Sequence, residues 1–278
     1  MAELEILVDG LAMPESGRWH DGRLWFAHWI AQQVVAVDAD GKAEYFDVPV
    51  ERPMGWSVDW LPDGRMLTTG DKVRRYEPDG SITVLAEQVA NEVVIDANGN
   101  IYLNGADFDF AGGAAPKAGY IKLLTPDGSL REVAGEIDFP NGMVITGRTL
   151  VIAESFAGRL SAFDIEPDGG LTNRRVFAEN LGPDGIVLDA EGAIWVQTGG
   201  AAVVRVRDGG EILDRVDLPA ERAPFSVTLG EFNGRPTLFM LTSVWHASDS
   251  IVDNLTRLRT GPRTGQIFAV PVTVPPMR

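Results

Sequence analysis

Residues 58–80 read VDWLPDGRMLTTGDKVRRYEPDG, which is three short apolar runs separated by turns. Asp63-Gly64 joins the first two runs, and Asp79-Gly80 follows the third. Asp-Gly between such runs favours a tight hairpin, because both residues tolerate a positive φ. The segment therefore predicts consecutive antiparallel strands joined by short turns.

The same order of runs and turns recurs roughly every 35 to 50 residues, which is the length of one four-stranded propeller blade. Six such units account for nearly all of the 278 residues. We therefore predict an all-β fold, a six-bladed β-propeller that forms a single domain over residues 1–278. The regular hairpin turns disfavour a β-sandwich or a parallel β-helix. No segment gives a comparable signal for a helix.

The two ends of the chain carry apolar runs that fall outside the six units. We expect Leu4–Val8 to pair with Gly265–Val270 and so to close the ring. Closure removes the exposed strand edges that a linear array of hairpins would leave.

One position in each unit, just before an apolar run, carries a residue whose chemistry varies. The six residues are Glu15, Met54, Asn91, Asn141, Asp184 and Phe225. All of them except Asn91 follow a proline. A propeller brings equivalent positions of its blades together around one axis. We expect the four oxygen-bearing side chains to meet in a central channel, with Met54 and Phe225 as an apolar wall.

A cluster of carboxylate and amide oxygens is the donor set that a hard divalent cation prefers. The alternative is that Pro-Asn-Gly and Pro-Asp-Gly are ordinary turns whose side chains cap their own backbone. That alternative does not cover all four positions, because no glycine follows Glu15 and no proline precedes Asn91. We therefore predict one divalent metal ion in the channel. Calcium is the ion we expect, while zinc, manganese, magnesium and ferrous iron also accept such donors.

The chain has a formal net charge of -16 and no cysteine. The acidic balance offers no basic face to nucleic acid or to an anionic membrane. The lack of cysteine excludes disulfides, thiolate catalysis and thiolate metal sites. The first residues lack the basic and apolar regions of a signal peptide, and no run reaches the roughly 18 apolar residues of a membrane span. We expect a cytoplasmic monomer that acts on a small molecule.

Several longer strings resemble the senescence marker protein/regucalcin/gluconolactonase family. The strings are Pro14–Trp19, Phe139–Met143, Ala153–Leu160 and Pro183–Ile186 with Asp189–Gly192. The resemblance covers essentially the whole chain. It implies a six-bladed propeller with one central divalent cation that hydrolyses sugar lactones or related esters. It also implies that Glu15, Asn141 and Asp184 bind the metal, and that Asn91 contacts the substrate.

Two positions depart from the family pattern around Asn91. Glu92 stands where the family usually has aspartate, and Val89 stands where some members have arginine. Glu92 either reaches the channel and contacts substrate, or is turned away by the alternation of side chains along a strand.

Three further residues are candidates for substrate contact. Trp19 and Trp56 lie near the variable positions in the sequence. His246 follows Trp245 and either lines the channel mouth or has no role. The stretch 106–119 is longer than a hairpin needs and is either a lid or a solvated insertion.

The resemblance implies a metal-dependent lactonase of carbohydrate metabolism that opens aldonolactones, as gluconolactonases do. The cation polarises the lactone carbonyl, and a water beside it is the nucleophile. Asp184 is the candidate general base, while Glu15 supplies charge. The alternatives are a hydrolase of another ester or a phosphotriester on the same propeller, and a non-catalytic calcium-binding propeller.

Overall fold

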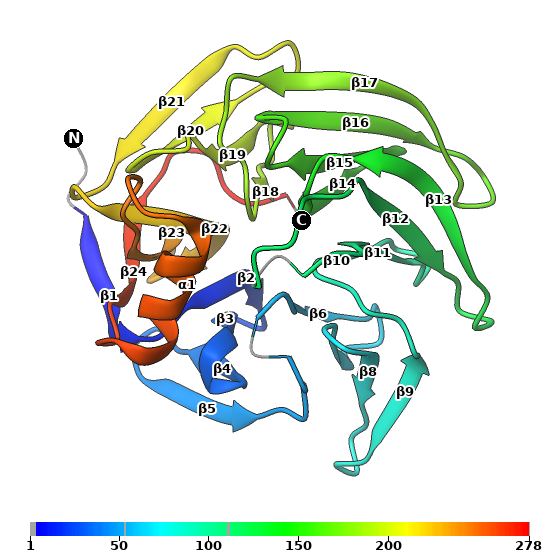
Figure 1. The fold of residues 1–278 in the computed structure, drawn as a ribbon, viewed down its shortest axis with the longest axis horizontal. Coiled ribbons are helices and arrows are strands. Elements are labelled where there is room, and N and C mark those ends of the chain that lie inside the picture. Colours follow the sequence, from blue (N-terminus) through cyan, green and yellow to red (C-terminus); the bar gives the residue numbers. More distant parts are fainter. Residues whose placement is uncertain (1–3, 53, 110–111, 278) are drawn as a thin grey trace.

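Six four-stranded antiparallel sheets surround a central axis in the computed structural model of the chain (Figure 1). The structure describes residues 4–52, 54–109 and 112–277. The predicted all-β, six-bladed propeller is therefore confirmed.

Each blade is built from four strands that follow one another in the sequence, except in the sixth blade. The first comprises β2 (Pro14–His20), β3 (Arg23–His28), β4 (Gln33–Val37) and β5 (Ala43–Asp47); the second β6 (Val58–Trp60), β7 (Met66–Thr68), β8 (Val73–Tyr76) and β9 (Ile82–Ala86). The third comprises β10 (Val93–Ile95), β11 (Ile101–Ala106), β12 (Gly119–Leu124) and β13 (Leu130–Ile137).

The second half of the ring repeats this order. The fourth blade comprises β14 (Pro140–Thr146), β15 (Thr149–Glu154), β16 (Arg159–Ile165) and β17 (Leu171–Glu179); the fifth β18 (Val187–Leu188), β19 (Ile194–Gln197), β20 (Ala202–Val206) and β21 (Ile212–Asp217). The sixth comprises β22 (Arg222–Phe232), β23 (Arg235–Val244), β24 (Gly265–Pro271) and β1 (Glu5–Leu11).

The ring closes as the sequence predicts, because the N-terminal strand completes the last blade. In that pairing β1 runs antiparallel to β24, with Glu5 opposite Ala269 and Leu11 opposite Gly265. Strands from both ends of the chain therefore lie side by side in one sheet (Figure 1).

The core lies between neighbouring blades, where the apolar faces of two sheets meet. Leu24 and Phe26 of the first blade, for example, pack in one cluster with Phe239 of the sixth. This packing fixes the angle between blades, and so fixes how the innermost strands present their first residues to the axis.

Within its described residues the chain also forms two helical segments, for which the sequence gives no signal comparable to that of the hairpin turns. A single turn of 3-10 helix, η1 (Trp29–Ala31), follows β3, and α1 (Ile251–Thr260) lies between β23 and β24. The side chain of Ser250 caps α1 by accepting a hydrogen bond from the Asp253 backbone N–H. Leu255 and Leu258 are buried and pack in one cluster with Met13 and Met54. No helix in the described part of the chain is long and apolar enough to cross a membrane.

The long stretch 106–119 connects β11 to β12 in the third blade, and its Phe110 lies outside the described residues. Gly113 of this loop lies against α1, because a Cβ placed on it would be 3.1 Å from Cγ2 of Val252. The third and sixth blades are on opposite sides of the ring, so the loop and α1 meet across the channel mouth.

Candidate functional site in the central channel

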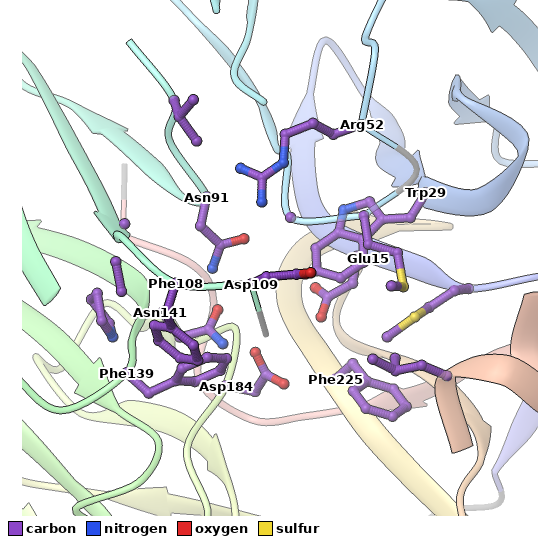
Figure 2. A pocket seen from close by; sticks show the side chains of 18 of the residues that line it. Glu15, Trp29, Arg52, Asn91, Phe108, Asp109, Phe139, Asn141, Asp184 and Phe225 are labelled. Carbon is purple, nitrogen blue, oxygen red and sulfur yellow. The ribbon is translucent and has the colours of Figure 1, made fainter. Parts of the chain in front are cut away.

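The six variable positions of the repeat come together around one pocket, as Figure 2 shows for five of them. All six line a cavity of about 940 Å³, including its open mouth: Glu15, Met54, Asn91, Asn141, Asp184 and Phe225. The four oxygen-bearing side chains point toward a common centre, and Phe225 lies to one side of them (Figure 2). The channel therefore has the polar floor and apolar wall that the repeat predicts.

Hydrogen bonds hold three of the polar residues in place, and for two of them the partner lies on the second strand of the blade. The Asp184 backbone N–H donates to Oε1 of Gln197 at 2.9 Å, and the Asn91 N–H donates to the Asn104 carbonyl at 2.7 Å. The Glu15 carboxylate accepts a hydrogen bond from the next backbone N–H, that of Ser16, at 2.8 Å. These contacts position the side chains before any ligand arrives.

The glycines after Asn141 and Asp184 allow neighbouring blades to approach closely. A Cβ on Gly142 would lie 2.6 Å from the Ile186 nitrogen, and one on Gly185 would lie 2.7 Å from Oγ of Ser226. The Pro-Asn-Gly and Pro-Asp-Gly strings therefore reflect packing between blades as well as turn chemistry.

The two carboxylates of the floor are destabilised as charged groups. Burial raises the pKa of Glu15 well above its ordinary value, and the nearby carboxylates of Asp184 and Glu92 raise it further. Burial also raises the pKa of Asp184, with a further contribution from Glu92. Crowded, desolvated carboxylates of this kind are stabilised by a counter-charge at their centre.

One carboxylate oxygen of the floor has no hydrogen-bond partner among the described residues and is available to bind a metal. Oδ1 of Asp184 is buried and makes no hydrogen bond within the described residues. The described residues hold no cluster of three or more His, Cys, Asp and Glu side chains suited to a metal. An ion held here would therefore depend on amide oxygen from Asn141 in addition to Glu15 and Asp184, a donor set that suits a hard cation.

Glu92 lies beside the site rather than in the pocket lining. It is 2% exposed, and one of its carboxylate oxygens lies 3.0 Å from Nη2 of Arg18. Arg18 also lies 3.5 Å from a carboxylate oxygen of Asp59. This placement favours the second of the two alternatives for Glu92, in which its side chain is turned away from the channel. Its carboxylate pairs with Arg18 of the same chain and does not line the pocket.

The structure does not bring the two predicted tryptophans into the pocket. Trp56 is fully buried in a cluster with Val34 and Val58, and Trp19 stacks on Phe239 with ring centroids 5.6 Å apart. Sequence proximity to the variable positions was a poor guide here, because packing between blades takes up both indole rings. Neither placement supports contact with a ligand.

His246 lies next to the pocket without lining it. Its backbone N–H donates to Oδ1 of Asn254 in α1 at 2.9 Å. The preceding residue, Trp245, does line the pocket. His246 thus helps to attach α1 at the mouth, and the indole beside it is the group that faces a ligand.

A second set of lining residues was not predicted to belong to the site, although Val89 was noted as a departure from the family pattern. Four of them stand two positions before a variable residue: Met13, Arg52, Val89 and Phe139. The repeat itself carried this signal, because the same offset recurs in four blades. Further lining residues come from insertions. Phe108 and Asp109 belong to the stretch 106–119, which was expected to be a lid or an insertion, whereas Trp29 of η1 and Leu255 of α1 were not predicted.

A family model described as SMP-30/Gluconolactonase/LRE-like region matches residues 13–244. The chain belongs to this family. Among its relatives, zebrafish (Danio rerio) regucalcin is 31% identical over 177 residues, 58% of either chain. The diisopropyl-fluorophosphatase of Loligo vulgaris is 27% identical over 153 residues, so the match spans about half of that enzyme's length and 49% of this chain.

Solved structures of this family share the fold. A luciferin-regenerating enzyme superimposes with a TM-score of 0.80 at 16% identity, over 100% of this chain and 98% of its own. A gluconolactonase from Xanthomonas campestris gives a TM-score of 0.74 at 21% identity, over 97% of this chain and 90% of its own. At these identities the likeness shows a lactonase-like propeller fold and does not by itself assign a substrate.

Proposed function

We propose that this protein is a divalent-metal-dependent hydrolase that opens lactones. The observation that carries the proposal is the convergence of Glu15, Asn141 and Asp184 at the pocket floor, with Oδ1 of Asp184 buried and unpartnered among the described residues. The kinship with regucalcins and the fold shared with a gluconolactonase support the same reaction class.

Glu15, Asn141 and Asp184 would hold the ion. When bound, the cation would polarise the substrate carbonyl and offset the charge that develops on its oxygen. Asp184 accepts a proton from the attacking water through its carboxylate, while the water oxygen bonds to the carbonyl carbon. The bond to the ring oxygen then breaks, and that oxygen takes the proton to give a hydroxy acid. Asn91 orients the substrate by hydrogen bonding.

Finer points belong to the proposal as well. We expect calcium as the native ion, since a solved family structure at 20% identity is described as a calcium-binding regucalcin. We expect a monomer that acts in the cytoplasm on a small molecule, with aldonolactones as the reference substrates. Hydrolysis of a phosphotriester is the second candidate, because the squid fluorophosphatase is a relative.

The test is ring opening by metal-stripped protein, with calcium, magnesium, manganese, zinc or ferrous iron added back one at a time. We expect one ion to restore hydrolysis, and Asp184→Asn to lower kcat by about 10²- to 10⁴-fold. Asp208→Asn, at a surface carboxylate paired with Arg175, is the matched control and should leave the rate unchanged. Protein that binds an ion tightly yet opens no lactone, whatever ion is added, would disprove the lactonase.

A further inference from the structure

We infer that the preferred substrate is a lactone with an apolar substituent, such as an alkyl or aryl group, rather than a ring that carries hydroxyls at every carbon. This inference rests on the proposed function, and it concerns the pocket walls instead of the floor. It follows from three features: what lines the walls, how the wall side chains are oriented, and how few polar groups stand among them.

One wall is formed by apolar residues from three blades and α1. Met13 and Met54 are 3% and 7% exposed, and they pack with Leu255 of α1 in one cluster that also includes Trp29 and Phe225. Figure 2 shows Phe225 on this side of Glu15 and Asp184. The wall is thus continuous with the core behind it and cannot easily move aside.

The aromatic rings on this wall present carbon to the pocket. Nε1 of Trp29 donates to the Trp56 carbonyl at 2.5 Å, so its polar atom is already engaged with the protein. Phe225 meets Trp245 edge to face, with centroids 5.4 Å apart. Trp29, Phe225 and Trp245 are only half-buried, so part of each ring stays open to a ligand.

The opposite wall has the same character. Phe139 stacks on Phe156, with ring centroids 4.3 Å apart. The ring centroid of Phe139 lies 5.9 Å from that of Phe108 of the long loop. Figure 2 places Phe108 and Phe139 beside Asn141, across the pocket from Phe225. A ring opened at the floor therefore extends between two apolar surfaces.

Few side chains on these walls can bind a hydroxyl group. Apart from the four polar residues of the floor, the charged or amide side chains of the described lining are Arg52 and Asp109. Oδ1 of Asp109 already accepts a hydrogen bond from the Gly112 N–H at 2.9 Å. A sugar lactone would press most of its hydroxyls against carbon, where they lose water and gain no partner. An apolar substituent gains from burial on the same surfaces.

The experiment compares three lactones with the metal-loaded enzyme: phenyl-substituted γ-butyrolactone, unsubstituted γ-butyrolactone and glucono-δ-lactone. We expect kcat/KM for the phenyl compound to exceed that for glucono-δ-lactone by at least about tenfold. Phe225→Asn should lower kcat/KM for the phenyl compound by about tenfold, mainly through KM, and change that for γ-butyrolactone by less than about threefold. Phe46→Asn, at an exposed phenylalanine of β5, is the matched control.

A binding measurement separates this inference from the proposed function. The phenyl-substituted lactam cannot be opened readily, and calorimetry reports its affinity without turnover. If no lactone is opened but the lactam binds, and binds more weakly to Phe225→Asn, the lactonase fails and the apolar pocket stands. If glucono-δ-lactone is the better substrate, or if the lactam does not bind, the inference is overturned.

Discussion

At the scale of single residues, the glycine after Asn141 decides how closely two blades approach at the floor of the pocket. The Gly142 N–H donates to the Asp184 carbonyl at 3.1 Å, and a Cβ there would lie 2.8 Å from that same oxygen. Backbone atoms cannot yield as a flexible side chain can, so Gly142→Ala should push Asp184 away from Asn141.

We expect Gly142→Ala to cost about 1–3 kcal/mol in the free energy of unfolding and to weaken calcium binding measured by calorimetry. Gly200→Ala is the control, because the nearest atom to its new Cβ, Oγ1 of Thr198, lies 3.9 Å away. Equal stability and calcium affinity in Gly142→Ala and the wild type would contradict this account of the motif.

Asp184 should cost stability in the metal-free protein, because its charge is buried and is repelled by the carboxylate of Glu92. Replacing it with an uncharged isostere removes that repulsion. We expect Asp184→Asn to raise the melting temperature of metal-stripped protein by about 2–4 °C, which corresponds to about 1 kcal/mol. The same variant should lose most of the rise that calcium produces in the wild type. A lower melting temperature without metal, or an undiminished response to calcium, would argue against a cation site at Asp184.

The sequence predicted the floor of the pocket better than its walls. The repeat identifies the floor directly, because equivalent residues of six blades must meet at the axis. Arg52 and Phe139 stand two positions before variable residues, so the repeat could have identified them as well. Of the residues at this offset, only Val89 was noted from the sequence. Trp19 and Trp56 were predicted to contact substrate because they are close in sequence to residues at the axis. Such a residue can still turn its side chain into the space between blades, as both tryptophans do.

At the scale of strands and loops, the string Ala153–Leu160 has a structural explanation in the fourth blade. Glu154 ends β15 and is fully buried, and its carboxylate accepts hydrogen bonds from Arg159 of β16, Ser161 of β16 and Arg174 of β17. Three strands of one blade are therefore joined through one carboxylate. Burial alone would raise the pKa of Glu154, but hydrogen bonds from Arg159, the Asp138 N–H, Ser161 and Arg174 lower it to about 2.

This pKa predicts how stability depends on pH. The folded value lies below the ordinary 4.5, so Glu154 contributes stability above about pH 4.5 that is lost as the pH falls toward 2. The shift corresponds to about 3 kcal/mol. Glu154→Gln should lower the free energy of unfolding by about that amount at pH 7, and by about half of it near pH 3.

Denaturant unfolding at the two pH values checks this expectation. Glu166→Gln is the control, because its carboxylate is half-exposed and lies 4.0 Å from Arg148, a surface pair worth less than about 1 kcal/mol. A loss in Glu154→Gln that is the same at pH 7 and pH 3 would show that shape, and not charge, explains the role of this residue.

Helix α1 is an element that the sequence did not predict, whereas the stretch 106–119 was expected to be a lid or an insertion. The repeat predicts strands, and α1 and the loop 106–119 are not part of the repeat. A capping pattern was present, since Ser250 is followed three residues later by Asp253. The apolar residues Ile251, Val252, Leu255 and Leu258 also recur at a helical spacing, although only Leu255 and Leu258 are buried. The cap and this spacing together were a readable helix signal. These two insertions contribute Phe108, Asp109 and Leu255 to the pocket wall.

At the scale of the whole molecule, a hydrogen bond beside the floor links every pair of neighbouring blades. The donor and acceptor pairs, in order around the ring, are Val58 N–H to Ser16 Oγ, Thr69 Oγ1 to the Asn91 carbonyl, Asn104 Nδ2 to the Asn141 carbonyl, Gly142 N–H to the Asp184 carbonyl, Gly185 N–H to the Phe225 carbonyl and Gly17 N–H to Ser226 Oγ. The geometry of the site is thus a property of the closed ring, and any opening of the ring should reach the floor.

The ring closes through β1, so its removal is the sharpest test of that dependence. Deleting residues 1–11 exposes the edge of β24 and removes Leu7, Val8 and Leu11 from the cluster around Phe26. One buried leucine and two partly buried aliphatic side chains contribute about 3–6 kcal/mol. The melting temperature should therefore fall by about 10 °C, and the bare edge should promote association.

Light scattering after gel filtration and calcium calorimetry report the two consequences separately. Deletion of residues 1–3, which leaves β1 whole, is the control and should behave as the full chain does. We expect the longer deletion to associate or unfold and to bind calcium at least about tenfold more weakly, because the interface that Gly17 and Ser226 join between the first and sixth blades then lacks the packing of β1. A stable monomer that lacks β1 and keeps its calcium affinity would show that the three remaining strands of the sixth blade position Glu15 and Asp184 without the fourth.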